Sequence, residues 1–168
     1  SCLLNERGGI IDDLIVYKLA DNFYRIVVNA GTADKDIAWF QAEVKQFAVT
    51  IQPRMDLSII AIQGPEAMAK TQSILTPARL AAVQALAPFE AALTEGWLIA
   101  RTGYTGEAGY EIILPNEEAI VCWNALLAAG VSPCGLGARD TCRLEAGLNL
   151  YGSDMDDSVT PLESNLTW

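Results

Sequence analysis

The sequence predicts an α+β fold in which two small mixed lobes each combine an antiparallel sheet with flanking helices. Two apolar strand patterns meet at Asp21-Asn22, a pair typical of tight turns, so the chain opens with a hairpin. Further along, the order strand, helix, hairpin, helix differs from the regular alternation of a doubly wound parallel sheet. Between these regions, Pro53 to Asp56 interrupt a strand pattern with a proline and two charges, which marks an internal boundary.

The first lobe is predicted from strand and helix periodicity. Its hairpin joins strands from Ile10 to Ala20 and from Phe23 to Asn29. Thr32 can then cap a helix from Ala33 to Phe47, and a short strand from Ala48 to Gln52 closes the lobe. The helix carries apolar residues at spacings of three and four, namely Ile37, Phe40, Val44 and Phe47.

The second lobe is predicted to start with a new strand after the proline boundary. Glycine and proline then separate its elements, and Asn116 is expected to cap one of the helices. The predicted elements are a strand at 57–63, helices at 65–75 and 78–86, a hairpin of 97–102 with 109–114, and helices at 116–129 and 136–146.

Composition excludes several classes of function. The 168 residues are 51% hydrophobic, and 21 acidic against 11 basic residues give a formal charge of −10. This charge repels phosphate backbones and anionic lipid, so we expect neither a nucleic-acid nor a membrane partner. Because no apolar run approaches the roughly 20 residues that a bilayer crossing needs, we expect a soluble protein. The pattern of its cysteines adds the expectation of a cytoplasmic location.

The absence of histidine restricts the available chemistry further. It removes catalytic triads and the commonest metal ligand, so acid–base work falls to carboxylates, tyrosine or lysine. The four cysteines show no Cys-x-x-Cys pairing, and reduced thiols without a metal are the simplest expectation. Those residues are Cys2, Cys122, Cys134 and Cys142.

A glycine-punctuated stretch at 101–115 is the strongest candidate for a ligand site. Glycines at 103, 106 and 109 permit a sharply turned loop that presents Tyr104 and Glu107 before an extended strand. Glu111 points away from its apolar neighbours Tyr110 and Ile112. A plain hairpin with solvent-exposed polar groups is the alternative explanation.

Two adjacent aspartates in the first predicted strand are the strongest candidates for chemistry. Asp12 and Asp13 point to opposite faces, and each has apolar neighbours on its own face. A partly desolvated carboxylate in such a setting has a perturbed proton affinity. Periodicity cannot choose between the two, and both could instead satisfy turn or backbone donors.

Together with several other segments, these motifs resemble the aminomethyltransferase (T-protein) family of the glycine cleavage system. The likeness covers nearly the whole chain. It is carried by NERGGIIDDLIV at 5–16, RTGYTGEAGYEIILP at 101–115, GLGARDTCRLEAG at 135–147, NLYGSDMD at 149–156 and TPLESNLTW at 160–168.

The resemblance implies roles for individual residues. It assigns catalysis to Asp13, with Tyr17 further along the same strand face as a ligand contact and Asn29 at the end of the second strand. It maps the pterin-binding glutamate to Glu111. Arg143 would hold that carboxylate or donate to the pterin carbonyl, although a helix-surface salt bridge is the alternative. Tyr104 would pack beside the flat ligand, and Tyr151 is a weaker candidate of the same kind.

The resemblance also implies an architecture and an activity. The chain would be an internal fragment of a three-domain folate-binding transferase, with residues 1–52 and 142–168 in one lobe and 53–141 in the other. The activity would move a methylene unit from the lipoyl carrier protein (H-protein) to tetrahydrofolate with release of ammonia. We expect the fragment alone to be inactive. The alternatives are a non-catalytic folate-binding module, a folate-dependent demethylase or oxidase lobe, and a plain interaction domain.

Overall fold

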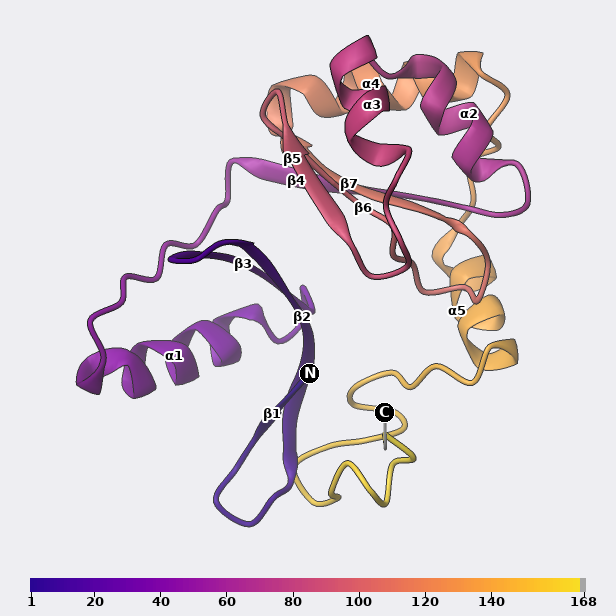
Figure 1. The fold of residues 1–168 in the computed structure, drawn as a ribbon. Coiled ribbons are helices and arrows are strands. Elements are labelled where there is room, and N and C mark those ends of the chain that lie inside the picture. The colour runs from indigo at the N-terminus through magenta and orange to yellow at the C-terminus, as the bar shows by residue number, and fades with distance from the viewer. Residues whose placement is uncertain (167–168) are drawn as a thin grey trace. The chain divides into compact units, whose positions relative to one another are not determined.

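The computed structural model describes residues 1–166, which form two compact units (Figure 1). The first unit comprises Ser1–Arg54 and the chain from Asn149 onward, and the second comprises Met55–Leu148. The sequence placed the two boundaries after residues 52 and 141. The compact units instead divide after Arg54 and after Leu148. Residues 167 and 168 of the predicted first lobe lie outside the described residues.

The first unit contains a three-stranded antiparallel sheet in the order β1-β2-β3. Its strands are β1 (Cys2–Leu4), β2 (Ile10–Ala20) and β3 (Phe23–Val28). The predicted hairpin of β2 and β3 is therefore confirmed, since Asp21 and Asn22 form the turn between them.

The helix of the first unit differs from its prediction. Helix α1 (Ala33–Glu43) ends four residues early and continues as the single 3₁₀ turn η1 (Val44–Gln46). The predicted apolar stripe is not buried, and its last member, Phe47, is 63% exposed. The residue that α1 does bury is Asp36. The prediction of a strand at 48–52 was also wrong. This segment, which precedes Pro53, is largely exposed and pairs with none of the described strands.

The second unit is built on a four-stranded antiparallel sheet in the order β4-β7-β6-β5. Its strands are β4 (Leu57–Gln63), β5 (Ala91–Thr94), β6 (Trp97–Ala100) and β7 (Gly109–Pro115). The predicted hairpin of β6 and β7 is confirmed. Strand β5 was missed: it joins β6 through a tight turn at Glu95 and Gly96, where φ is 46° and 79°.

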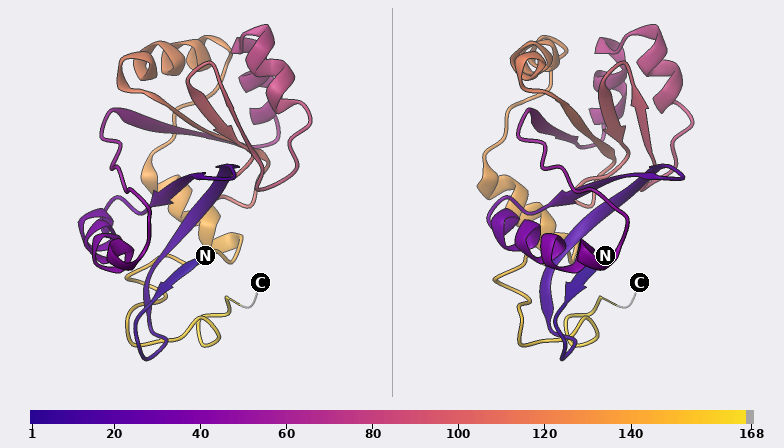
Figure 2. Two further views of the ribbon diagram at one scale, coloured as in Figure 1. Left: turned by 60° about the vertical axis from the view of Figure 1, so that its left-hand side comes forward. Right: turned by 90° about the vertical axis from the view of Figure 1, so that its left-hand side faces the viewer.

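Helices cover one face of this sheet (Figure 2). They are α2 (Ala67–Ile74), α3 (Pro77–Val83) and α4 (Asn116–Ala128), each close to its predicted range. Their apolar side chains and the inward-facing residues of the strands form one hydrophobic core, in which Tyr110, Ile112 and Leu114 are fully buried. Helix α5 (Leu136–Glu145) follows. The mixed α+β class with antiparallel sheets is thus confirmed. None of the described helices has the length and apolar character that a membrane span requires.

Candidate functional site

The two adjacent aspartates of β2 have different environments. Ile10, Asp12 and Leu14 form the buried face of the strand, and Asp12 has no exposed surface at all. Asp13 lies on the other face and is only half-buried. The strand therefore presents one carboxyl group to the interior of the first unit and the other to its surface.

Asn29 connects these two carboxyl groups. Leu14 pairs with Val28 in the antiparallel register, so the next pair places Asn29 opposite Asp13. Its side-chain amide donates to Oδ1 of Asp12 at 2.9 Å and to Oδ1 of Asp13 at 3.1 Å. Sequence reasoning placed Asp13 and Asn29 in one site, and the structure brings them into direct contact.

The environment of Asp13 raises its proton affinity. Burial raises the pKa of the Asp13 carboxyl, and the nearby charge of Asp12 adds to this effect, while the hydrogen bond from Asn29 opposes it. A half-buried carboxyl group with one fixed donor can exchange a proton with a ligand or stabilise a cation beside it.

Tyr17 shares the face of Asp13 by alternation, but the two lie far apart along the strand. Four residues of extended chain span about 13 Å, so one small group could not touch both. Tyr17 is buried and its neighbour Val16 is exposed, which reverses the burial pattern of the first half of β2. A ligand that reached both residues would have to lie along the strand.

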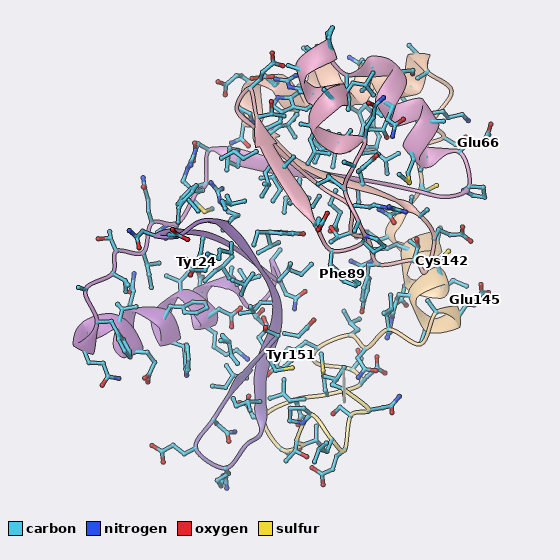
Figure 3. All side chains as sticks on the ribbon, viewed as in Figure 1. Tyr24, Glu66, Phe89, Cys142, Glu145 and Tyr151 are labelled. Carbon is cyan, nitrogen blue, oxygen red and sulfur yellow. The ribbon has the colours of Figure 1, made fainter. Side chains whose placement is uncertain are left out.

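Lys35 and Tyr151 form a second polar group in the first unit. The ammonium of Lys35 donates to the hydroxyl of Tyr151 at 2.8 Å and lies 4.3 Å from the centre of its ring. The Tyr151 hydroxyl donates in turn to Asp157 at 3.2 Å. Tyr151, labelled in Figure 3, is therefore held by a charged network, which gives it a polar role in addition to packing.

The sequence did not identify Asp36, Thr32 or Lys35 as members of this site. Thr32 was expected to cap α1, but its side chain caps no backbone amide and donates instead to Oδ2 of Asp12. Asp36 lies in the first turn of α1, where an acidic side chain ordinarily faces solvent and interacts with the helix dipole. The only available signal was the four-residue spacing from Thr32 to Asp36, which places both on one helix face.

In the second unit, two of the three glycines of the 101–115 stretch are required because neighbouring atoms leave no space for a side chain, and not because of an unusual backbone conformation. Only Gly106 has a positive φ, of 74°. A Cβ on Gly109 would lie 2.0 Å from the carbonyl oxygen of Ile62, and one on Gly103 would overlap the side chain of Gln63. The expectation that all three glycines adopt conformations closed to other residues was therefore wrong for two of them.

Glu111 lies at the centre of the sheet face opposite the helices. It is paired with Ala61 of β4 on one side and Ala100 of β6 on the other, so both of its direct neighbours across the sheet have small side chains. One carboxylate oxygen accepts the hydroxyl of Thr102 at 2.5 Å. As predicted, Glu111 points away from Tyr110 and Ile112, which are fully buried.

Two arginines of α5 are engaged within the second unit. The guanidinium of Arg139 lies 5.1 Å from the ring centre of Tyr104, so the helix supports the tyrosine of the loop. Arg143 is buried and donates to Asp140 at 2.8 Å and to the carbonyl of Leu148 at 3.1 Å. The helix salt bridge considered as an alternative for Arg143 is thus present, but in a buried position.

The cysteines carry no disulfide, since all four are free. Burial raises the pKa of the Cys122 thiol to about 11, which keeps it protonated at neutral pH. Among the residues that the structure describes, no three cysteine, aspartate or glutamate side chains gather as metal ligands.

Comparisons with known proteins show the family. The whole chain, residues 1–168, matches the family model described as the GCVT N-terminal domain. An aminomethyltransferase of Legionella pneumophila (strain Lens) is 60% identical over 168 residues, covering all of this chain and 47% of that relative. One of Bordetella pertussis is 59% identical over 171 residues, again covering all of this chain and 46% of the relative.

A solved structure agrees with these matches. The glycine cleavage system aminomethyltransferase T of Bartonella henselae superimposes with a TM-score of 0.91 at 38% identity, covering all of this chain and 45% of the other. The chain therefore spans about half the length of the relatives it matches. From these matches, the chain belongs to the family of the GCVT N-terminal domain, in which its relatives are aminomethyltransferases.

Proposed function

We propose that a protein containing this chain is the aminomethyltransferase of glycine cleavage. It transfers the methylene carbon of an aminomethyl group, carried on the lipoyl arm of a carrier protein, to tetrahydrofolate in the cytoplasm. Two carbon–nitrogen bonds to the folate form, while the carbon–sulfur bond and the original carbon–nitrogen bond break. The two protons lost by the folate nitrogens leave with ammonia and the lipoyl thiol.

The observation that carries this proposal is the contact of Asn29 with the carboxyl group of Asp13. A fixed donor and a raised pKa suit a carboxyl group that orients an amine and stabilises positive charge as a carbon–nitrogen bond breaks. Because the amide fixes the orientation of the carboxyl group, little reorganisation is needed during the reaction. Asp13 is the proposed catalytic residue.

The proposed pterin contacts come from the second unit. The carboxylate of Glu111 can accept two hydrogen bonds from the amino-pyrimidinone edge of the ring, and its direct neighbours across the sheet are small alanines. Tyr104 would pack against the ring, and Arg143 would donate to it or hold the glutamate. In the first unit, Tyr17 and Asn29 are the proposed ligand contacts.

Substitutions in a protein of the relatives' full length test the catalytic role of Asp13. Asp13→Asn should reduce turnover by roughly 10²- to 10⁴-fold while largely sparing tetrahydrofolate affinity. Steady-state kinetics with a lipoyl carrier protein as donor, and calorimetric titration with tetrahydrofolate, measure the two quantities. Asp21→Asn is the matched control, because the Asp21 side chain is 97% exposed at the turn of the same hairpin. Unchanged turnover in Asp13→Asn would remove Asp13 from the mechanism.

Glu111→Gln tests pterin recognition separately. Losing the charge on the acceptor should weaken tetrahydrofolate binding by about 10- to 100-fold, the usual value of hydrogen bonds to a charged group. Glu107→Gln in the neighbouring exposed loop is the control. Tight folate binding by both variants would show that Glu111 does not contact the pterin. Folate binding without any transfer by the unsubstituted protein would favour the non-catalytic folate module.

A further inference from the structure

Asp36 is the least expected buried side chain of the first unit. It lies in the first turn of α1 with no exposed surface. Within residues 1–166, neither of its carboxyl oxygens meets a hydrogen-bond donor. Because an ionised carboxylate without a donor or a cation is strongly disfavoured in the protein interior, this side chain must hold a proton or share one.

Asp12 is the group with which such a proton can be shared. Its own donors are already assigned: the Asn29 amide and the backbone N–H of Asp13 reach Oδ1 at 2.9 Å each, and the Thr32 hydroxyl reaches Oδ2. The hydroxyl has a single proton, which is directed at Asp12. Thr32 also lowers the pKa of Asp36, but this effect is smaller than that of Asp12. The carboxyl group of Asp36 therefore faces an acceptor that is fully buried and already well supplied with donors.

Electrostatics agrees with this geometry. Burial, followed by the hydrogen bonding and the charge of the neighbouring Asp12, raises the pKa of Asp36 to about 7, while a hydrogen bond from Thr32 and the charge of Lys35 oppose this rise. Two carboxyl groups at such a site ionise in separate steps, as in other carboxylate pairs with one proton between them. Below about pH 7, Asp36 is then mainly protonated and can donate to Asp12.

We propose that Asp36 and Asp12 share a single buried proton, and that this pair is a positioning device that holds the Asn29 amide against Asp13. The chain of contacts runs from α1 to β2 and then to the end of β3. With the proton in place, Asp12 keeps one negative charge and accepts from Asn29. When the proton is lost, two buried charges repel each other, and the support of Asn29 is weakened.

The other charged groups around the pair are few. Lys35 is the cation whose charge acts on Asp36, and it lowers the pKa of that carboxyl. Its ammonium is itself engaged, donating to the backbone carbonyl of Ile11 and to Tyr151. Asp13 lies on the opposite face of β2 and interacts by charge with Asp12, and the charge of Asp157 acts on Lys35. Because the Asn29 amide donates directly to Asp12, a change in the charge of the pair should alter the hydrogen bonding of this amide.

Carboxyl-carbon NMR of the isotopically labelled chain tests the proposal without any ligand. Between pH 4 and 9, one aspartate resonance should titrate with a midpoint near 7, and the side-chain amide of Asn29 should shift with the same midpoint. Asp36→Asn should abolish both transitions, whereas Asp34→Asn, an exposed aspartate in the same helical turn, should leave them in place.

Two results would overturn the proposal. One is the absence of any aspartate midpoint near neutrality in the unsubstituted chain, which needs no variant to fold. The other is persistence of the Asn29 transition in Asp36→Asn. The existence of the carboxyl pair does not depend on the proposed transferase function. Only the effect of the pair on the chemistry of Asp13 rests on that function. A loss of transferase activity in the full-length protein would therefore not be confused with failure of the pair.

Discussion

The two units bury their sheets in different ways. In the second unit, one face of a four-stranded sheet packs against three helices through a core of hydrophobic side chains. In the first unit, a three-stranded sheet has a smaller buried set, and two aspartates, Asp12 and Asp36, are fully buried within it. The second unit is thus stabilised mainly by apolar burial, whereas the first also depends on hydrogen bonds and on one proton. This difference predicts that the same kind of change has unequal effects in the two units.

The largest loss of stability is expected in the apolar core. Ile112 is fully buried at the centre of β7, so Ile112→Ala should reduce the free energy of unfolding of the second unit by about 2 to 5 kcal/mol. Hydrogen exchange resolved by segment measures this loss. Ile59→Ala is the control, because Ile59 is 51% exposed on β4 and its truncation should cost much less. Equal losses from both would mean that burial does not distinguish the two faces of the sheet.

A smaller but local loss is expected in the first unit at Gly9. A Cβ added there would lie 2.0 Å from the backbone carbonyl oxygen of Asp157, which cannot move as easily as a side-chain end. Gly9→Ala should therefore destabilise the first unit by about 1 to 3 kcal/mol, the usual cost of overpacking. Gly31→Ala is the matched control, since nothing lies within 4 Å of the added carbon. Native-like exchange rates at 149–166 in Gly9→Ala would contradict this expectation.

Alanine substitutions of two threonines that precede helices should differ in which property they change, and not only in how much stability they remove. Thr76 accepts the backbone N–H of Arg79 and caps α3, so Thr76→Ala should cost about 1 kcal/mol of stability. Thr32 performs no such capping and donates to Asp12. Thr32→Ala should therefore alter the NMR signals of Asn29, while Thr76→Ala should leave them unchanged. Chemical denaturation and amide spectra separate the two outcomes.

A further effect is a slope of stability with pH, confined to the first unit. The folded-state pKa of Asp36, about 7, lies above its ordinary value of 3.8. Its stabilising contribution is therefore complete below about pH 4 and is lost as the pH rises through 7. Burial also raises the pKa of Asp13, so its contribution to stability likewise decreases as the pH rises.

Two exposed carboxyl groups of the first unit act in the opposite direction. Hydrogen bonds from Ser158 lower the pKa of Asp156, and those from Thr160 lower the pKa of Glu163. The difference in unfolding free energy between the unsubstituted chain and Asp36→Asn isolates the Asp36 contribution. That difference should move in favour of Asp36→Asn from pH 4 to 8, and a constant difference would contradict the assignment.

Much of the fold follows from local patterns, and its exceptions have physical causes. Strands β2, β3, β4 and β7 were predictable because their apolar runs end at turn residues or proline. Strand β5 was missed because the short stretch Ala91–Thr94 shows no alternation and is fixed by its pairing with β6. The strand predicted at 48–52 has suitable residues but no partner strand, and pairing is a tertiary property.

The same limit applies to the candidate site. Alternation along β2 separated Asp12 from Asp13, and the position of Asn29 at a strand end was evident from the sequence. The burial of Asp36 was not, because an acid in the first turn of a helix normally interacts favourably with the helix dipole while exposed to solvent. The interaction of Asp36 with Asp12 reverses that expectation, and it joins two residues of different elements that no local pattern connects.

The connection between Asn5 and Asp157 has a consequence for how the chain folds. The amide of Asn5 donates to the carbonyl of Asp157 across 152 positions of sequence, and Gly9 packs against the same carbonyl. The first unit is therefore discontinuous, with the whole second unit inserted within it. On the ribosome, the inserted unit is complete first, and the strand that carries Asp13 waits for the late segment to close the loop. Mutations that slow folding of the insert should then delay assembly of the acidic site without touching any of its residues.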